Sequence, residues 1–233
     1  MNTDTIALLD KHFDLAVNAP DGIKRLREMI LTLAMQGKLV PQDPKDQPAS
    51  ELLKDIEAEK QRLVKEVKIK ESKPLPPIKS EEVPYQLPES WEWVRLGDIS
   101  SKIHYGYTAS ANESIKDIKL LRITDIQDNA VDWERVPGCI VEKENVDQYL
   151  LSENDILIAR TGGTVGKTYL VREVNVKAVF ASYLIRVVPP TKINVEYLKD
   201  YLECPLYWQQ LYAACSGTGQ PNVNGVSLSM LKI

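Results

Sequence analysis

A proline-rich stretch at residues 73–88 divides the sequence into two parts with different hydrophobic periodicity. Proline lacks a backbone N–H and fixes φ, so five prolines in sixteen residues prevent one continuous helix or strand from crossing this stretch. They also favour extended chain. We therefore predict a linker at 73–88 between an N-terminal region at 1–72 and a C-terminal domain at 89–233.

The N-terminal region shows two stretches of helical periodicity. The first begins after Pro20 and ends at Gly37, which is typical of a helix of about four turns. A turn-rich connector at 40–48 separates it from a second, more charged stretch at 49–70. Its apolar stripe requires a packing partner and consists of Leu52, Leu53, Ile56, Leu63 and Val67. We expect a helical hairpin or coiled-coil-like region.

The C-terminal domain instead carries short β-branched and aromatic runs separated by polar turns, which are typical of strands. The expected strands lie at 91–96, 119–124, 155–160, 167–172 and 179–188. One helix is expected at 195–214, broken by Pro205. The predicted fold class is α+β, with the helical region followed by a mixed α/β domain around a twisted, largely antiparallel sheet.

No apolar run approaches the roughly 20 residues of a membrane helix, and the first residues do not resemble a secretory signal. These features predict a cytoplasmic protein without membrane contact. Three cysteines and two histidines lack the spacing of a zinc site. We expect no metal and no cofactor.

The segment DILIARTGGTVGKTYLV resembles a nucleotide-binding P-loop, because Gly166-Lys167-Thr168 follows a predicted strand. A P-loop would need glycine at position 161, where the sequence has Thr161, and a helix after Thr168, where it predicts a strand. A nucleotide-dependent enzyme is therefore the least favoured of the functions that we consider.

Other catalytic motifs are absent from the sequence. Adenine methylation would require Asn or Asp before two prolines and an aromatic residue, but Pro76-Pro77 follows Leu75. Asp117-Ile118-Lys119 matches half of a metal-dependent nuclease motif, without a Pro-Asp in the same segment. No nucleophile elbow occurs either. We predict no catalytic residue.

The same glycine turn suits contact with a nucleic-acid backbone, because its N–H groups and Lys167 can bind phosphate. Residues 156–195 carry six cationic residues and one acid, although the whole chain has a net charge of −4. The alternatives remain that this turn is an ordinary hairpin and that the charges form a solvated face.

Two further loops contain side chains suited to reading base edges. SKIHYGYTA presents Lys102, His104, Tyr105 and Tyr107 around Gly106, and CSGTGQPNVNG presents Gln220, Asn222 and Asn224 between glycines. Amide side chains can form paired hydrogen bonds with adenine, as arginine and lysine can with guanine. Structural tyrosines and amides that only satisfy turns are the alternatives.

Four phrases, in order along the chain, resemble the DNA-specificity (S) subunit of type I restriction-modification systems. LREMILTLAMQGKLVPQDPKDQPASELL resembles its helical region, and LPESWEWVRLGDI the opening of its target recognition domain. ILIARTGGTVGKTYLV and GTGQPNVNGVSLSMLKI resemble the middle and the end of that domain. The resemblance spans roughly residues 20–233.

The resemblance implies a non-catalytic protein whose target recognition domain reads one half of a two-part site in double-stranded DNA through the major groove. Its helices would set the spacing and hold the methyltransferase (M) subunits, and a restriction (R) subunit would join the complex. A full S subunit has two recognition domains and two helical regions. This chain, with one of each, is expected to be a fragment or a half-subunit, for which self-pairing is an option.

On this basis we predict DNA contacts from a set of loop residues, with Lys167 serving phosphate and Gln220 or Asn222 serving bases. The DNA-binding candidates are Arg160, Thr161, Gly163, Thr164, Lys167, Tyr105, Tyr107, Gln220 and Asn222. The subunit-interface candidates are Leu52, Leu53, Ile56 and Leu63. The rival function is a protein–protein assembly module that does not itself read DNA.

Overall fold

The computed structural model of the protein describes residues 3–71, 73–215 and 220–233. Its N-terminal region consists of three helices. They are α1 (Thr3–Asn18), α2 (Gly22–Met35) and α3 (Ala49–Lys65). Helices α2 and α3 confirm the two helices that the hydrophobic periodicity predicted, whereas α1 was not predicted. The expected second helix ends earlier than predicted, because Val67 adopts a left-handed backbone with φ 57°.

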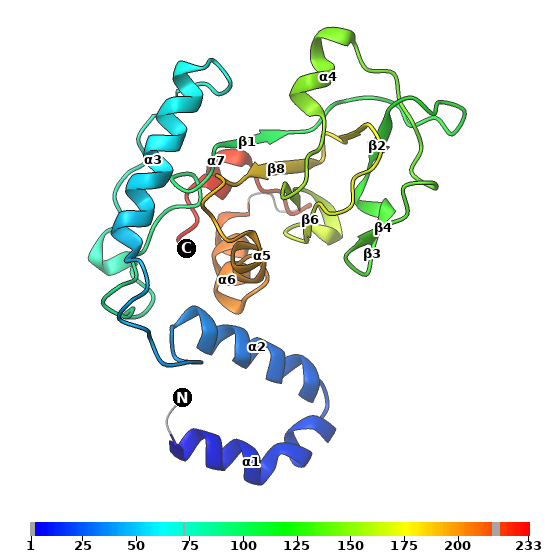
Figure 1. Ribbon diagram of the computed structural model, residues 1–233. Helices are drawn as coiled ribbons and strands as arrows, with labels where there is room; N and C mark the ends of the chain where they lie inside the picture. The colour runs from blue at the N-terminus through cyan, green and yellow to red at the C-terminus, as the bar shows by residue number, and fades with distance from the viewer. Residues whose placement is uncertain (1–2, 72, 216–219) are drawn as a thin grey trace.

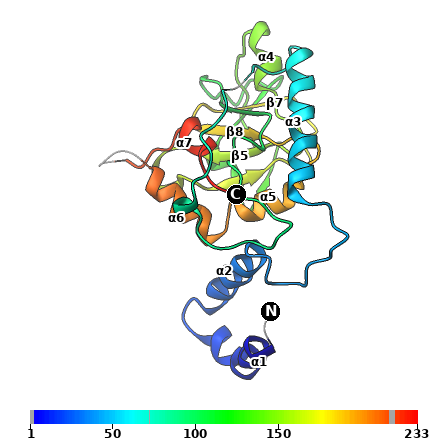
Figure 2. The ribbon, with the colours of Figure 1, turned by 90° about the vertical axis from the view of Figure 1, so that its left-hand side faces the viewer.

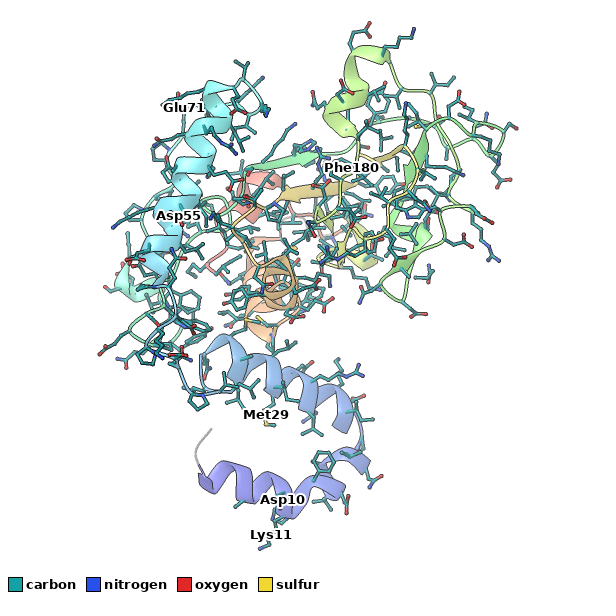
Figure 3. The ribbon with its side chains drawn as sticks, in the orientation of Figure 1. Asp10, Lys11, Met29, Asp55, Glu71 and Phe180 are labelled. Carbon is teal, nitrogen blue, oxygen red and sulfur yellow. The ribbon has the colours of Figure 1, made fainter. Side chains whose placement is uncertain are left out.

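Helices α1 and α2 form a hairpin that projects from one end of the molecule (Figure 1). The turn between them needs glycine, since a Cβ on Gly22 would lie 1.9 Å from the carbonyl oxygen of Ala16. Met29 points from α2 toward α1 (Figure 3). The other side of α2 contacts α5 (Val195–Tyr201) and α6 (Pro205–Ala214), which connects the hairpin to the C-terminal domain.

The C-terminal domain contains a four-stranded antiparallel sheet in the order β1-β8-β5-β6. Two smaller pairs accompany it, a parallel pair of β2 with β7 and an antiparallel pair of β3 with β4. The strands are β1 (Lys102–Tyr105), β2 (Lys119–Leu121), β3 (Ile126–Gln127), β4 (Ala130–Val131), β5 (Ile156–Ala159), β6 (Thr168–Leu170), β7 (Ala178–Phe180) and β8 (Leu184–Val188). The α+β class and the largely antiparallel pairing are confirmed.

Some predicted elements were wrong in detail. Residues 91–96 form no strand, although the Val94 and Leu96 N–H groups donate to the C-terminal segment. The run at 179–188 is two strands, β7 and β8, separated by a turn that contains Tyr183. The helix at 195–214 is indeed broken, and α6 begins at Pro205. The remaining elements are α4 (Lys143–Tyr149), α7 (Gly225–Ser229), η1 (Ser80–Glu82), η2 (Ile123–Asp125) and η3 (Gly162–Thr164).

The central strand β5 is buried on both faces. Ile156 and Ile158 pack into a core with α2, α3, α5, α6 and α7, whereas Leu157 and Ala159 pack into a second core that contains Phe180. This alternation follows from the two-residue period of a strand. Phe180 lies inside the domain, and Asp55 lies on the exposed side of α3 (Figure 3).

Helix α3 runs along one side of the C-terminal domain (Figures 1 and 2). Ile56 is 1% exposed and belongs to the first core, with Leu52 and Leu53 packed against the same core. Lys60 Nζ donates to the carbonyl oxygens of Gly97 and Asp98 at 3.1 and 3.0 Å. The apolar stripe of α3 is thus packed largely against the C-terminal domain of the same chain.

The linker at 73–88 is extended apart from η1, and a buried arginine attaches it to the domain. Arg95 Nε donates to the Pro76 carbonyl at 2.8 Å, and its Nη2 pairs with Glu82 at 3.0 Å. Its Nη1 donates to the Met230 carbonyl near the C-terminus at 2.8 Å. Arg95 therefore ties the linker to the end of the chain, while the predicted division at 73–88 stays a prediction.

Candidate nucleic-acid interface

The glycine turn that the sequence singled out connects β5 to β6. Gly162 and Gly166 both have positive φ, 75° and 85°, a conformation that glycine adopts without steric cost. At Gly166 space is limiting as well, because a Cβ would lie 2.0 Å from Leu211 Cδ2. Residues 168–170 form a strand as predicted, so the helix that a P-loop needs is not there.

The turn pairs with the later loop at residues 220–225. Thr161 and Asn222 form an antiparallel bridge. The Gly162 N–H donates to the Pro221 carbonyl at 3.2 Å, and the Val223 N–H to the Arg160 carbonyl at 3.0 Å. Two loops that lie 60 residues apart in the sequence are therefore neighbours. Residues 216–219 of the second loop lie outside the described residues.

Tyr105, at the end of β1, completes this arrangement. The Arg160 guanidinium carbon lies 4.5 Å from the centre of the Tyr105 ring, which is cation–π geometry. The Tyr105 hydroxyl accepts a hydrogen bond from the Gly225 N–H at 3.0 Å. We call Tyr105, Arg160 and Asn222 the recognition cluster.

The recognition cluster contains two buried polar atoms without a hydrogen-bond partner in the described structure, Arg160 Nε and Asn222 Oδ1. Buried polar groups are normally paired, because an unpaired one costs about 1–3 kcal/mol. One buried donor and one buried acceptor thus remain unsatisfied, on the two chain segments that pair here. Asn224, by contrast, is a helix cap, since its side chain accepts from the Ser227 N–H at 2.8 Å.

The other candidate residues lie beside the recognition cluster or away from it. Gln220 is exposed, and its amide nitrogen lies 3.2 Å from where a Gly162 Cβ would be. Gly163 and Lys167 are exposed, and no ion pair of Lys167 is present within the described ranges. The carbonyl of half-buried Thr164 accepts from the Lys167 N–H at 3.0 Å.

Tyr107 does not join the recognition cluster. Its ring lies 5.2 Å from that of Tyr149, and its N–H donates to the Phe180 carbonyl at 2.8 Å. Sequence reasoning missed Tyr183, an exposed tyrosine whose carbonyl accepts from the Arg160 N–H at 3.0 Å. No signal in the sequence marked it, because residues 179–188 are predicted as one strand.

The basic segment is less cationic at the surface than its sequence suggested. Arg186 is 6% exposed and pairs with buried Asp155 at 3.1 Å. Asp155 lies one residue before the basic stretch at 156–195. Arg172 pairs with Glu196. The expected basic face is therefore reduced, because these two arginines are neutralised within the chain.

Arg186 is the centre of a buried polar network. Its Nε donates to His104 Nε2 at 2.8 Å, and its Nη2 to the Gln148 carbonyl at 3.0 Å. Burial, together with the charges of Arg186 and Lys102, lowers the pKa of His104 to about 3. Burial raises the pKa of Asp155, an effect that Arg186 opposes, and it lowers the pKa of Arg186. This network holds β1, β5, β8 and the end of α4 together.

The subunit-interface candidates are mostly occupied inside the molecule. Leu52, Leu53 and Ile56 pack against the chain's own core, whereas half-buried Leu63 lies outside the buried clusters. Apolar side chains are instead exposed on the helical hairpin of α1 and α2, where they are Phe13, Leu15, Ile23 and Ile30. The described residues contain no cluster of three metal-ligating side chains and no helix that could cross a membrane.

Comparison with known proteins identifies the family to which the chain belongs. Residues 88–233 match the type I restriction modification DNA specificity domain. The chain therefore belongs to that family, which confirms the resemblance seen in the sequence.

Among its relatives are two Escherichia coli proteins. The chain is 45% identical over 157 residues to the type I restriction enzyme EcoAI specificity subunit, covering 66% of this chain and 26% of that protein. It is 34% identical over 228 residues to the EcoEI specificity subunit, covering 94% of this chain and 38% of that protein. The chain thus spans about a quarter to two fifths of the length of these relatives.

A solved HsdS subunit from Thermoanaerobacter tengcongensis is 19% identical with a TM-score of 0.47, covering 91% of this chain and 44% of that one. A chain from a structural study of complex assembly in the type I R-M system is 18% identical with a TM-score of 0.48, covering 99% of this chain and 46% of that one.

Proposed function

We propose that residues 89–233 recognise a specific sequence in double-stranded DNA, one half of a two-part site, as part of a type I specificity subunit. The observation that supports this most strongly is the recognition cluster within the matched domain, in which Arg160 is stacked on Tyr105 and forms no ion pair with a described residue. Arginine is among the side chains that read base edges in the major groove.

In this proposal Lys167 contributes a sequence-independent contact. Its side chain is exposed beside the glycine turn and forms no ion pair within the described part of the chain. Such a lysine suits a phosphate oxygen, which fixes the register of the protein on DNA without reading sequence. Gln220 and Asn222, on the neighbouring loop, remain the candidates for base contacts.

We further propose that the chain directs the methyltransferase subunit, and through it the restriction subunit, to this DNA. The hairpin of α1 and α2 supports a protein contact, because Leu15 is 75% exposed and Phe13 is 53% exposed. Exposed apolar patches of this kind mark interaction sites. Leu15→Asp should abolish co-purification with the methyltransferase subunit, whereas Asp55→Ala, on exposed α3, should not.

The test of the DNA-reading function is selection by the full chain, alone and with its methyltransferase subunit, from a library of duplexes with randomised centres. Sequencing the bound fraction should give one enriched motif after several rounds. A bound fraction with no enriched motif would contradict the proposal, because the chain would then hold DNA without reading it. Retention of no duplex at all would favour the assembly module, in which the chain binds protein only. Salt-independent retention would point the same way, since binding to phosphates weakens as salt increases.

A further inference from the structure

Arg160 is held more rigidly than a surface arginine. Its N–H donates to the Tyr183 carbonyl and its carbonyl accepts from the Val223 N–H, both at 3.0 Å. It follows directly after the central strand β5. Its backbone is thus fixed between the turn that precedes β8 and the loop at 220–225.

The Arg160 side chain is also fixed, by stacking rather than by an acid. The guanidinium lies over the Tyr105 ring, and the hydroxyl of that ring is held by the Gly225 N–H. No carboxylate of the described residues forms an ion pair with Arg160. Stacking occupies a face of the planar guanidinium and uses none of its N–H donors.

The chemistry of the guanidinium indicates what kind of ligand Arg160 can bind. Arginine only donates hydrogen bonds, so its partner must offer acceptors. In the major groove guanine offers two acceptors, N7 and O6, whereas adenine pairs an acceptor with a donor, thymine offers the single acceptor O4 beside its methyl group, and cytosine offers a donor. A phosphate also accepts, but a mobile side chain such as exposed Lys167 can satisfy phosphate without such preorganisation.

We propose that Arg160 is a specificity-determining residue that donates to N7 and O6 of one guanine in the target, with Tyr105 as the positioning residue that holds its guanidinium. This inference rests on the proposed DNA recognition and adds the base and the residue that reads it. Lys167 then supplies affinity, and Arg160 supplies selectivity at one base pair.

The first test uses the unaltered full chain and the motif that it selects. Each guanine of that motif is replaced in turn by 7-deazaguanine, which lacks the N7 acceptor, and guanines in the flanking sequence outside the motif are replaced in the same way as the control. One guanine position should lose about 10- to 100-fold in affinity. A motif without guanine, or one in which no guanine replacement weakens binding, would overturn the assignment while leaving DNA recognition intact.

The second test repeats the selection with altered chains. Arg160→Gln should lose the preference for guanine at that same position, because glutamine pairs a donor with an acceptor and suits adenine instead, and Tyr105→Leu should weaken it. Arg172→Gln is the matched control, since Arg172 pairs with Glu196, and should select the original motif. If Arg160→Gln selects that motif unchanged, the assignment is wrong. If no chain, altered or not, selects any motif, the proposed function itself fails.

Discussion

Replacing Ile56 by alanine tests whether this residue belongs to the core of the chain or to a contact with another subunit. Ile56 is 1% exposed, and it packs from α3 into the core that contains β5 and α5 to α7. Truncating a fully buried isoleucine removes its transfer free energy and leaves a cavity, at a cost of about 2–5 kcal/mol. Taking about 3 kcal/mol, the midpoint of thermal unfolding should fall by about 6–12 °C for a chain of this size.

The matched control for this prediction is Leu63→Ala on the same helix, because Leu63 is half-buried and lies outside the buried clusters. We expect it to cost less than about 1 kcal/mol. Urea unfolding of each isolated chain, followed by circular dichroism and by tryptophan fluorescence, measures both losses. Equal and small losses would refute the packing of α3 on the domain and would return Ile56 to the surface available to other subunits.

Three further predictions concern charges and their surroundings. Lys167→Ala should weaken binding to all duplexes alike and reduce the slope of log affinity against log salt by about 0.9, and an unchanged slope in a titration would remove Lys167 from the interface. Asp155→Asn should lower the free energy of unfolding by about 3 kcal/mol, because it leaves the buried charge of Arg186 without its ion pair, and a loss below about 1 kcal/mol in urea unfolding would contradict that view. The pKa of His104 in the folded chain lies near 3, below its ordinary value of 6.5, so the unfolded chain binds the proton more readily. The contribution of His104 to the free energy of unfolding is therefore fully present above pH 6.5 and decreases as the pH falls toward 3. Allowing for partial solvent screening of this half-buried ring, its share of the loss between pH 6.5 and pH 5 should be about 1 kcal/mol; it should disappear in His104→Gln and persist in His12→Gln, and identical pH profiles for the two variants would refute it.

The sequence predicted those elements whose periodicity belongs to one local segment. Helices α2 and α3 and strands β5 and β6 follow from their apolar spacing, and the break at Pro205 follows from the chemistry of proline. The composition of residues 91–96 also predicts a strand, which the structure does not contain. Their actual partner is the C-terminal segment around Leu231, which spacing alone does not indicate.

The recognition cluster was only partly predictable for the same reason. The sequence marked Arg160, Tyr105 and Asn222 as chemically suited to DNA, but in three separate loops. Their proximity depends on the pairing of β1 with β8, of β8 with β5, and of Thr161 with Asn222. The number of cationic residues at 156–195 overstated the basic surface at Arg186, because the sequence does not show which cations are buried against an acid.

The most direct test of the central claim is the ratio of two dissociation constants at about 0.15 M salt, one for the duplex that the full chain selects and one for the same bases in shuffled order. Each base pair read in a groove contributes about 1–3 kcal/mol, so reading even two base pairs should make the selected duplex bind at least about 30-fold more tightly. A ratio near one, with both affinities decreasing equally as salt increases, would mean that this domain holds DNA without reading it.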